Sequence, residues 1–173
     1  PTTLPKGWAE VALGEVAEIN PRPKIRPVAS DLVPFVPMAA VDAEKSTIIA
    51  TIRVPFGDAA GGTTPFEDGD VLVAKITPCY QNGKIAQVHT AEAGFGSTEF
   101  HVVRGRPSEA DGRYLAHFLR QDWLRRAGEK RMTGTGGQRR VPKSFLTELA
   151  IPLPPLEEQK RIAAVLDQAE ELR

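Results

Sequence analysis

The pattern of apolar and polar positions divides the chain into a strand-rich part and a helical end. Between about residues 9 and 105, short β-rich runs are separated by Gly, Pro and Asp, as is typical of strands joined by tight turns. The runs expected to form strands are Val33–Met38, Thr47–Val54, Val71–Ile76, Lys84–His89 and Glu99–Arg104. The pattern therefore predicts a β-sheet and not a helical bundle.

Helical spacing begins after this part. Ser108 is a candidate N-cap with acidic residues in the following turn, and Gly128 is a candidate helix stop. The apolar positions that share one face of the expected helix are Leu115, Phe118, Leu119 and Leu124. A glycine-rich loop, Met132–Val141, and a strand-like run, Leu149–Leu153, follow.

The C-terminal segment predicts a helix entered through Pro155, with acidic residues in its first turn. Its apolar positions follow the 3, 4, 3 spacing of a coiled-coil seam, and one further leucine widens the stripe. These positions are Ile162, Val165, Ala169 and Leu172, with Leu166 beside them. The same periodicity also fits an amphipathic helix packed on its own domain. The expected fold class is α+β: a mixed, strongly twisted β-sheet with flanking helices and a C-terminal amphipathic helix of coiled-coil type.

Length and composition favour one folded domain with an appendage. The chain has 173 residues, of which 41% are apolar and 25% charged, as in soluble globular proteins. No apolar run approaches the roughly 20 residues that span a bilayer, and the first residues lack the pattern of a secretory signal. We therefore expect no membrane partner and a cytoplasmic location. The single cysteine, Cys79, and three histidines offer no zinc-binding cluster, so we expect no metal site.

The charge distribution changes this picture, because a net charge of zero conceals a basic segment. Between Arg120 and Lys143 there are eight basic residues and two acidic ones, a local excess of six positive charges. Basic residues gathered around a glycine-rich loop suit phosphate binding. The alternative is a helix face whose arginines are solvated and bind nothing.

Catalytic motifs are not found. The nearest match to the Asn/Asp-Pro-Pro-aromatic motif of DNA amino-methylases is Thr77-Pro-Cys-Tyr80, which departs from it at two of four positions. Glu158-Gln-Lys160 has a nuclease-like spacing but lies on the expected terminal helix without a Pro-Asp pair upstream. Gly134-Thr-Gly-Gly137 lacks the Lys-Ser/Thr of a P-loop. We therefore expect no catalytic residue in this chain.

Two polar loops carry the candidate DNA contacts. The first joins two expected strands; Asn82-Gly83 in it is also a plain hairpin-turn signal. Its candidates are Lys75, Thr77, Tyr80, Gln81, Asn82 and Lys84. The candidates around the glycine-rich loop are Lys130, Arg131, Thr133, Thr135, Gln138, Arg139, Arg140 and Lys143. Arg139 or Arg140 could read guanine and Gln138 adenine, each through two hydrogen bonds.

A family resemblance rests on the C-terminal segment. Ile151-Pro-Leu-Pro-Pro-Leu-Glu-Glu-Gln-Lys-Arg-Ile-Ala-Ala-Val-Leu166 resembles the sequence that closes target-recognition domains in type I restriction-modification specificity subunits. The opening Gly7-Trp8 with Val11-Ala-Leu-Gly-Glu-Val16 is similar to the family's usual entry. Asp70-Val-Leu-Val73, Gly96-Ser-Thr-Glu99 and Tyr114-Leu-Ala-His-Phe-Leu119 follow in the expected order. The resemblance covers nearly the whole chain.

The resemblance implies a non-catalytic, sequence-specific DNA recognition component that directs methylase and restriction subunits to a half-site. It implies a target-recognition domain over residues 1–153 and the beginning of the conserved spacer and dimerisation helix over 154–173. S-adenosylmethionine, ATP and magnesium are then expected only in partner subunits.

The partners that the resemblance implies are double-stranded DNA, methylase subunits, and a second recognition domain or a second copy joined through the terminal helix. The seam residues of that helix would then form a helix–helix interface. Whether the chain is a fragment or a half-subunit stays open. The alternative function is a protein-interaction module that recruits a methylase through this helix without binding DNA detectably.

Overall fold

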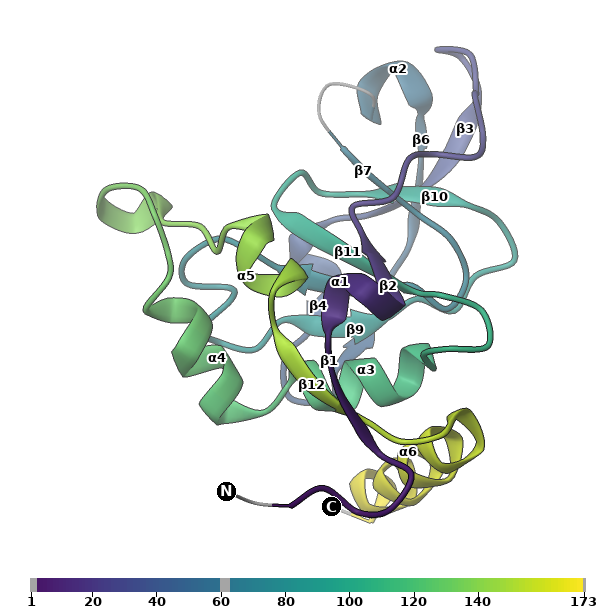
Figure 1. Ribbon diagram of the computed structural model, residues 1–173. Helices are drawn as coiled ribbons and strands as arrows, with labels where there is room; N and C mark the ends of the chain where they lie inside the picture. Colours follow the sequence, from purple (N-terminus) through teal and green to yellow (C-terminus); the bar gives the residue numbers. More distant parts are fainter. Residues whose placement is uncertain (1–2, 60–62, 173) are drawn as a thin grey trace.

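The computed structural model describes residues 3–59 and 63–172. Residues 1–2 and 60–62 of the expected recognition domain and residue 173 of the expected terminal helix lie outside the described residues. Within the described residues the chain forms two four-stranded sheets, two short strand pairs and a set of helices (Figure 1). The first sheet is antiparallel, with the order β2 (Ala17–Ile19), β11 (Phe100–Gly105), β8 (Val71–Ala74) and β9 (Ile85–Gln87). The second is mixed, with the order β6 (Ile52–Pro55), β3 (Leu32–Val36), β10 (Gly94–Gly96) and β7 (Thr64–Phe66). The expectation of an α+β fold with mixed strand directions is confirmed.

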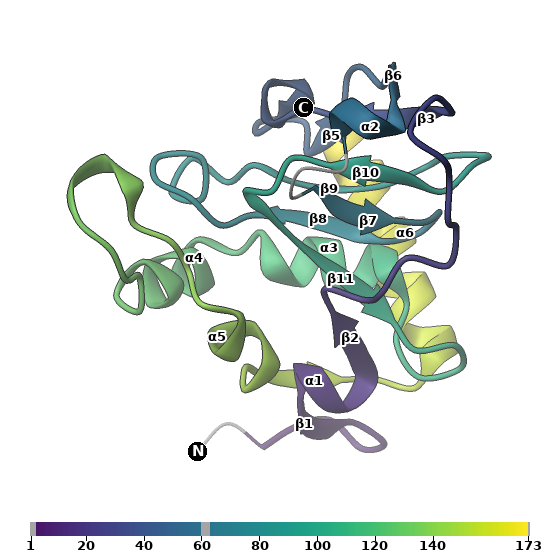
Figure 2. The same cartoon turned by 90° about the horizontal axis from the view of Figure 1, so that it is seen from above.

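Strand β8 shows why the core lies where it does. All four of its residues, Val-Leu-Val-Ala, are buried, because both faces of the strand are covered. Val71 and Val73 face a cluster that includes α3 (Gly112–Leu119), whereas Leu72 and Ala74 face a cluster shared with the second sheet. Alternate side chains of a strand point to opposite faces, so an uninterrupted apolar run fits a strand between two layers. Figure 2 shows this arrangement from above.

The single helix expected from Ser108 to Gly128 is wrong, because the structure has two helices. Helix α3 begins after Asp111, whose carboxylate accepts a hydrogen bond from the Tyr114 N–H at 2.9 Å. Ser108 instead has a positive φ of 65° in the preceding turn. A second helix, α4 (Asp122–Glu129), follows after a break at Arg120 and Gln121.

Helix α4 ends at Glu129, one residue beyond the stop predicted at Gly128, so Gly128 lies in the last turn of the helix. A Cβ atom at this position would lie 1.9 Å from the Tyr80 hydroxyl, so glycine is required by a close approach and not by a helix end.

The run Thr47–Val54 is likewise not one strand. It divides into β5 (Thr47–Ile48), which pairs with β4 (Val41–Asp42), and β6, which pairs with β3 in the second sheet. The apolar alternation continues through the point where the chain leaves one sheet and joins another, so the pattern conceals the break. The other expected strands are present; most are shorter than predicted, whereas Glu99–Arg104 corresponds to β11 at the same length, shifted by one residue.

The two ends of the domain meet in a strand pair. β1 (Ala9–Ala12) lies antiparallel to β12 (Ala150–Leu153), and α6 (Leu156–Glu171) begins directly after β12. Figure 1 shows α6 along the bottom of the molecule, next to the N-terminal segment. The remaining short helices are α1 (Leu13–Val16), α2 (Phe56–Ala59) and α5 (Lys143–Thr147), with single 3-10 turns at Met38–Ala40 and Gly136–Gln138. Among the described helices, none has the length and apolar character that crossing a membrane requires.

Candidate nucleic-acid interface

The glycine-rich loop Met132–Val141 projects from the edge of the molecule between α4 and α5 (Figures 1 and 2). Its base is closed by two backbone hydrogen bonds, Thr133 N–H to Arg140 O at 3.0 Å and Arg140 N–H to Thr133 O at 2.8 Å. Gly134 and Gly136 have φ values of 111° and 58°, which glycine adopts without strain and other residues rarely do. Thr133, Thr135 and Gln138 are exposed, so the loop presents its polar side chains to the surface.

The first predicted loop lies against the base of this one. The Thr77 N–H donates to Arg139 O at 2.9 Å, and Ile76 forms a β-bridge with Arg140. The Thr77 hydroxyl also lies 3.6 Å from Met132 Sδ. The structure therefore joins two loops that the sequence offered as separate candidates.

Tyr80, however, is contradicted as a surface DNA contact. It is 1% exposed, and its hydroxyl lies 3.5 Å from Leu124 O. Burial raises the pKa of the Tyr80 hydroxyl far above its usual value. The turn around Tyr80, closed by its N–H on Ile76 O and by Gly83 N–H on Tyr80 O, directs the ring inward against α4.

The other candidates of the first loop are mostly engaged within the protein. Gln81 donates to the Thr77 hydroxyl at 3.2 Å, and Lys84 donates to Met38 O at 3.1 Å. Lys75 is half-buried, and burial lowers the pKa of its ammonium group. Asn82 is exposed, but it lines a hollow beside Trp123 of α4 and not the glycine-rich loop. The glycine-rich loop thus supplies most of the accessible donors.

Arg139 and Arg140 hold that loop in place through hydrogen bonds to other groups of the protein. Arg139 Nη2 donates to Glu129 O at 3.1 Å. Arg140 donates to both carboxylate oxygens of Glu99, at 2.9 and 2.7 Å, and to Gln138 O at 2.9 Å. The hydrogen bonds from Arg140 lower the pKa of the Glu99 carboxyl below its usual value. Sequence reasoning missed Glu99 as a site residue, because nothing local indicates a partner 41 positions away.

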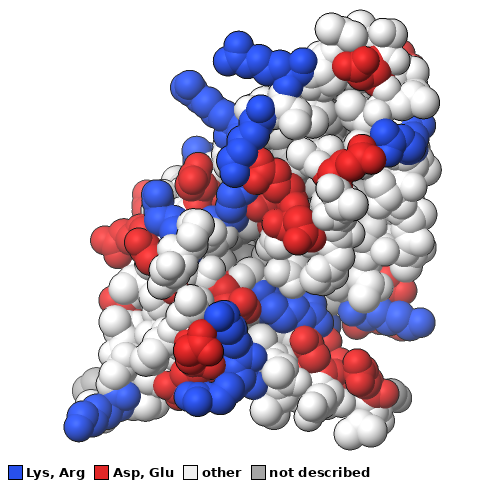
Figure 3. All heavy atoms as spheres, turned by 90° about the vertical axis from the view of Figure 1, so that its right-hand side faces the viewer, with Lys and Arg blue, Asp and Glu red and all other residues white. Residues whose placement is uncertain are grey.

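The accessible positive charge lies on either side of the loop. Lys130 and Arg131 precede it at the end of α4, and Lys143 follows it at the start of α5; all three are exposed. No ion pair of these three residues occurs in the described part of the chain. On the right-hand side of Figure 1, away from the loop, acidic and basic side chains lie side by side (Figure 3).

A buried histidine, His101, contacts the last residue of the glycine-rich loop. His101 Nε2 lies 2.8 Å from Val141 O, and Asn20 Nδ2 lies 3.1 Å from His101 Nδ1. A carbonyl oxygen only accepts, so the proton is on Nε2 and Nδ1 accepts from Asn20; the ring is neutral. Burial lowers the pKa of His101, and the charges of Lys75 and Lys143 lower it further.

Acid is therefore expected to destabilise the protein partly through His101. Below about pH 6.5 this histidine is protonated in the unfolded chain but stays neutral in the folded protein. The free energy of unfolding therefore decreases as the pH is lowered, by at most about 1.4 kcal/mol per pH unit from this group. His101→Gln, which offers a similar donor and acceptor, should flatten this slope in urea unfolding between pH 5 and 7. His89→Gln, on an exposed histidine, should leave it unchanged. Equal slopes for the two variants would contradict the role of His101.

At the opposite end of the domain, α6 is attached through Gln159, which is fully buried. Its side-chain oxygen accepts from the Asp111 N–H at 2.8 Å, and its amide nitrogen donates to Glu109 O at 2.9 Å and to Pro154 O at 2.8 Å. The glutamine of the Leu-Glu-Glu-Gln stretch thus joins α6 to the start of α3.

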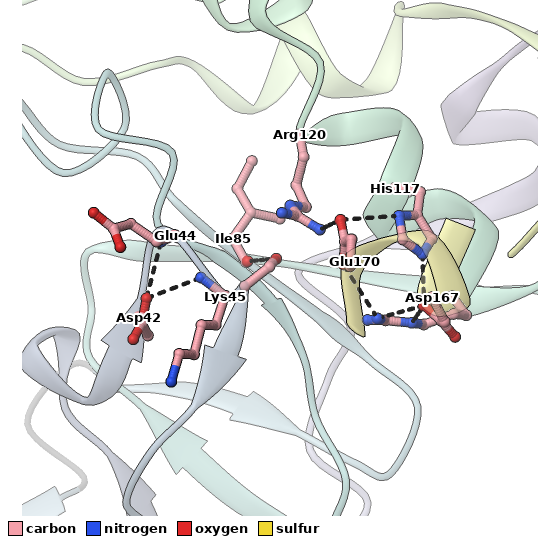
Figure 4. Close-up of polar contacts among 10 residues, drawn as sticks. Asp42, Glu44, Lys45, Ile85, His117, Arg120, Asp167 and Glu170 are labelled. Carbon is pink, nitrogen blue, oxygen red and sulfur yellow. Dashed lines mark hydrogen bonds and ion pairs between the residues drawn. The ribbon is translucent and has the colours of Figure 1, made fainter. Parts of the chain in front are cut away.

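Charged contacts extend this attachment along α6. Asp167 accepts from Arg113 and His117, both at 2.7 Å, and Glu170 accepts from Arg120 at 2.6 Å. Figure 4 shows Glu170 between Arg120 and His117, with Asp167 on the other side of the histidine. The spacing of His117, Asp167 and Glu170 would suit a metal ion. However, guanidinium groups already neutralise both carboxylates, so the arrangement is that of an ion-pair network.

The predicted seam of α6 largely faces away from these contacts. Ile162 is partly buried against the core, but Val165 and Leu172 are 64% and 89% exposed, and Ala169 and Leu166 are also exposed. The helix therefore both packs on its own domain and leaves apolar side chains uncovered. Pairing of this face with another helix stays a prediction.

Known proteins resemble this chain over almost its whole length. Residues 5–172 match the family described as "Type I restriction modification DNA specificity domain". The specificity subunits of the Escherichia coli type I restriction enzymes EcoEI and EcoAI are 36% and 35% identical to it, over 97% and 94% of this chain and 28% of each of those proteins. The crystal structure of the HsdS subunit from Thermoanaerobacter tengcongensis aligns with a TM-score of 0.81 at 31% identity, covering 100% of this chain and 45% of that one.

This chain thus spans less than a third of the length of those two E. coli proteins and less than half of the solved HsdS chain. The similarity extends from the N-terminal strand through both sheets to α6, the elements that carry and attach the glycine-rich loop. This chain belongs to the family of type I restriction modification DNA specificity domains.

Proposed function

We propose that this chain is a non-catalytic DNA target-recognition domain that reads the base sequence of a half-site in duplex DNA. The observation that carries the proposal is the match of residues 5–172 to a DNA specificity domain. The projecting loop supports it, because exposed hydrogen-bonding side chains lie there between exposed basic residues. Phosphate contacts position a protein on DNA, and contacts to base edges provide sequence specificity.

The residues divide between these two tasks. Lys130, Arg131 and Lys143 contact phosphates, and this part of the binding weakens as salt rises, because condensed counterions are released on binding. Gln138 reads an adenine through its amide, and Thr133 and Thr135 supply shorter-range hydroxyl groups.

Methylation and cleavage belong, in this proposal, to other subunits, which bind S-adenosylmethionine, ATP and magnesium. A methylase subunit, a second recognition domain or a second copy of this chain packs on the exposed face of α6. The exposure of Val165 and Leu172 supports this attachment, because water-exposed apolar side chains in a helical stripe are typical of interaction surfaces.

The proposal is tested by selecting duplexes from a random-sequence pool with the purified chain and then measuring affinity against salt concentration. Arg131→Glu with Lys143→Glu should lower affinity strongly and reduce the slope of log affinity against log salt by roughly two, because each phosphate that is no longer neutralised lowers the slope by about one. Lys6→Glu with Lys45→Glu makes the same charge change at two exposed lysines outside the loop and should have a far smaller effect. Equal reductions in the two double variants would contradict the assignment of the loop.

The same experiment separates the alternative function. A pure interaction module would retain no duplex even at low salt while its α6 still bound a methylase subunit. That outcome would replace DNA reading by recruitment as the function of the chain.

A further inference from the structure

We propose that Glu99 is a positioning residue for DNA reading: through Arg140 it holds the two polar loops in register and so contributes to sequence selectivity. The inference rests on the proposed function. It concerns an acidic residue on a surface expected to meet phosphates, where a negative charge is otherwise unfavourable.

Glu99 lies where three segments meet. The Lys75 N–H at the end of β8 donates to Glu99 O at 2.8 Å, and the Val141 N–H donates to Lys75 O at 2.8 Å. The Glu99 carboxylate accepts two parallel hydrogen bonds from Arg140, and this geometry fixes the orientation of the guanidinium plane. A single ion pair thus joins the start of β11 to the base of the glycine-rich loop, beside the end of β8.

The tip of the loop depends on this base. Gly134, Gly136 and Gly137 leave the backbone of the tip with wide conformational freedom, and a Cβ atom at Gly136 or Gly137 would meet no atom within 4 Å. The Arg140 guanidinium also donates to Gln138 O, so the residue proposed to read adenine is tied directly to the ion pair. Fixing Arg140 therefore fixes the position from which Gln138 reaches the DNA.

The electrostatics distinguish positioning from simple attraction. Glu99 neutralises the nearby Arg140, so the pair adds little net positive charge to the surface. Removing the carboxylate makes this surface more positive and should strengthen binding to any duplex. If Glu99 positions the loop, selectivity should nevertheless fall. The pair is partly exposed, with side-chain exposures of 40% for Arg140 and 26% for Glu99, so its removal should leave the overall fold intact.

The test is Glu99→Gln in the full chain, with two readouts. The first is the affinity for a duplex selected from a random pool divided by the affinity for an unselected random duplex, both measured at one salt concentration. We expect this ratio to fall about tenfold. The affinity for the random duplex should stay equal or rise. The second is amide hydrogen exchange without DNA, which should become faster at Thr133 and Arg140. Glu92→Gln is the matched control, because it removes a carboxylate that also pairs with an arginine, Arg53, on a different part of the surface.

A charge-swapped variant, Glu99→Arg with Arg140→Glu, should recover only part of the ratio, because it restores the ion pair but not the hydrogen bond to Gln138 O. An unchanged ratio with unchanged exchange in Glu99→Gln would overturn the inference. If the unsubstituted chain selects no sequence at all, the proposed function fails, and hydrogen exchange alone decides whether Glu99 holds the loop.

Discussion

Gln159→Leu is expected to lower the free energy of unfolding by roughly 3 kcal/mol or more, because three backbone groups around this buried side chain lose their hydrogen-bond partner at once and each group left unsatisfied inside the protein costs about 1–3 kcal/mol. Leucine fills a similar volume but offers neither the oxygen for the Asp111 N–H nor the amide protons for Glu109 O and Pro154 O. Urea unfolding of the purified chain measures the effect. Gln168→Leu, on the same helix at an exposed position, should change stability by less than about 0.5 kcal/mol.

A second substitution at this position separates hydrogen bonding from volume. Gln159→Glu keeps an acceptor for Asp111 N–H but brings a carboxylate against two carbonyl oxygens. It should therefore be strongly destabilising at neutral pH and recover partly in mild acid, where the carboxyl is protonated and donates to one carbonyl. A stability that does not change when Gln159 becomes leucine would show that the ion pairs of Asp167 and Glu170 hold α6 without it.

The parts of the fold that follow from sequence are those in which one local pattern has one structural solution. The Val-Leu-Val-Ala run of β8 fits a strand buried on both faces, and the structure places it between two clusters. The terminal helix, entered through Pro155 with acidic residues in its first turn, is present from Leu156 to Glu171. In both cases the local pattern and the tertiary environment agree.

The errors arise where a tertiary contact overrides a local signal. Gly128 has the appearance of a helix stop, but it is needed because the Tyr80 ring packs against α4. Tyr80 lies in a polar turn, where a surface position is the natural expectation, yet the turn directs it into the core. Each misassignment is one half of the same contact, between residues 48 positions apart, which no local pattern can indicate.

The candidate site shows the same limit. The glycine-rich loop could be found from composition and charge, since its basic residues are contiguous in sequence. Which arginines are ion-paired could not, because Glu99 reaches Arg140 from the turn that precedes β11. The accessible charge therefore lies mainly on Lys130, Arg131 and Lys143, outside the Gln138-Arg-Arg140 stretch that chemistry alone favoured.

Stability of the sheet that carries the loops is expected to depend on Asp70 to a similar degree as on Gln159. Asp70 is 1% exposed and accepts hydrogen bonds from Arg104 at 2.8 and 2.7 Å and from the Glu67 N–H at 2.8 Å. Arg104 directly follows Val103, which pairs with Val71, so the ion pair closes the end of the β8–β11 ladder opposite to Glu99. Asp70→Ala leaves a largely buried guanidinium without its two shortest hydrogen bonds, and the ion pair that remains is with Glu67, at 3.4 Å.

The expected destabilisation for Asp70→Ala is about 3–5 kcal/mol, the usual result of removing one partner of a buried ion pair. Asp68→Ala removes the same charge at an exposed aspartate nearby and should lower the free energy of unfolding far less. Because the destabilisation comes from the unpaired arginine, Asp70→Ala combined with Arg104→Leu should be more stable than the sum of the two single effects predicts. Additive effects in this cycle would show that the two side chains act independently, and would contradict the stabilising role given to their ion pair at the end of the β8–β11 ladder.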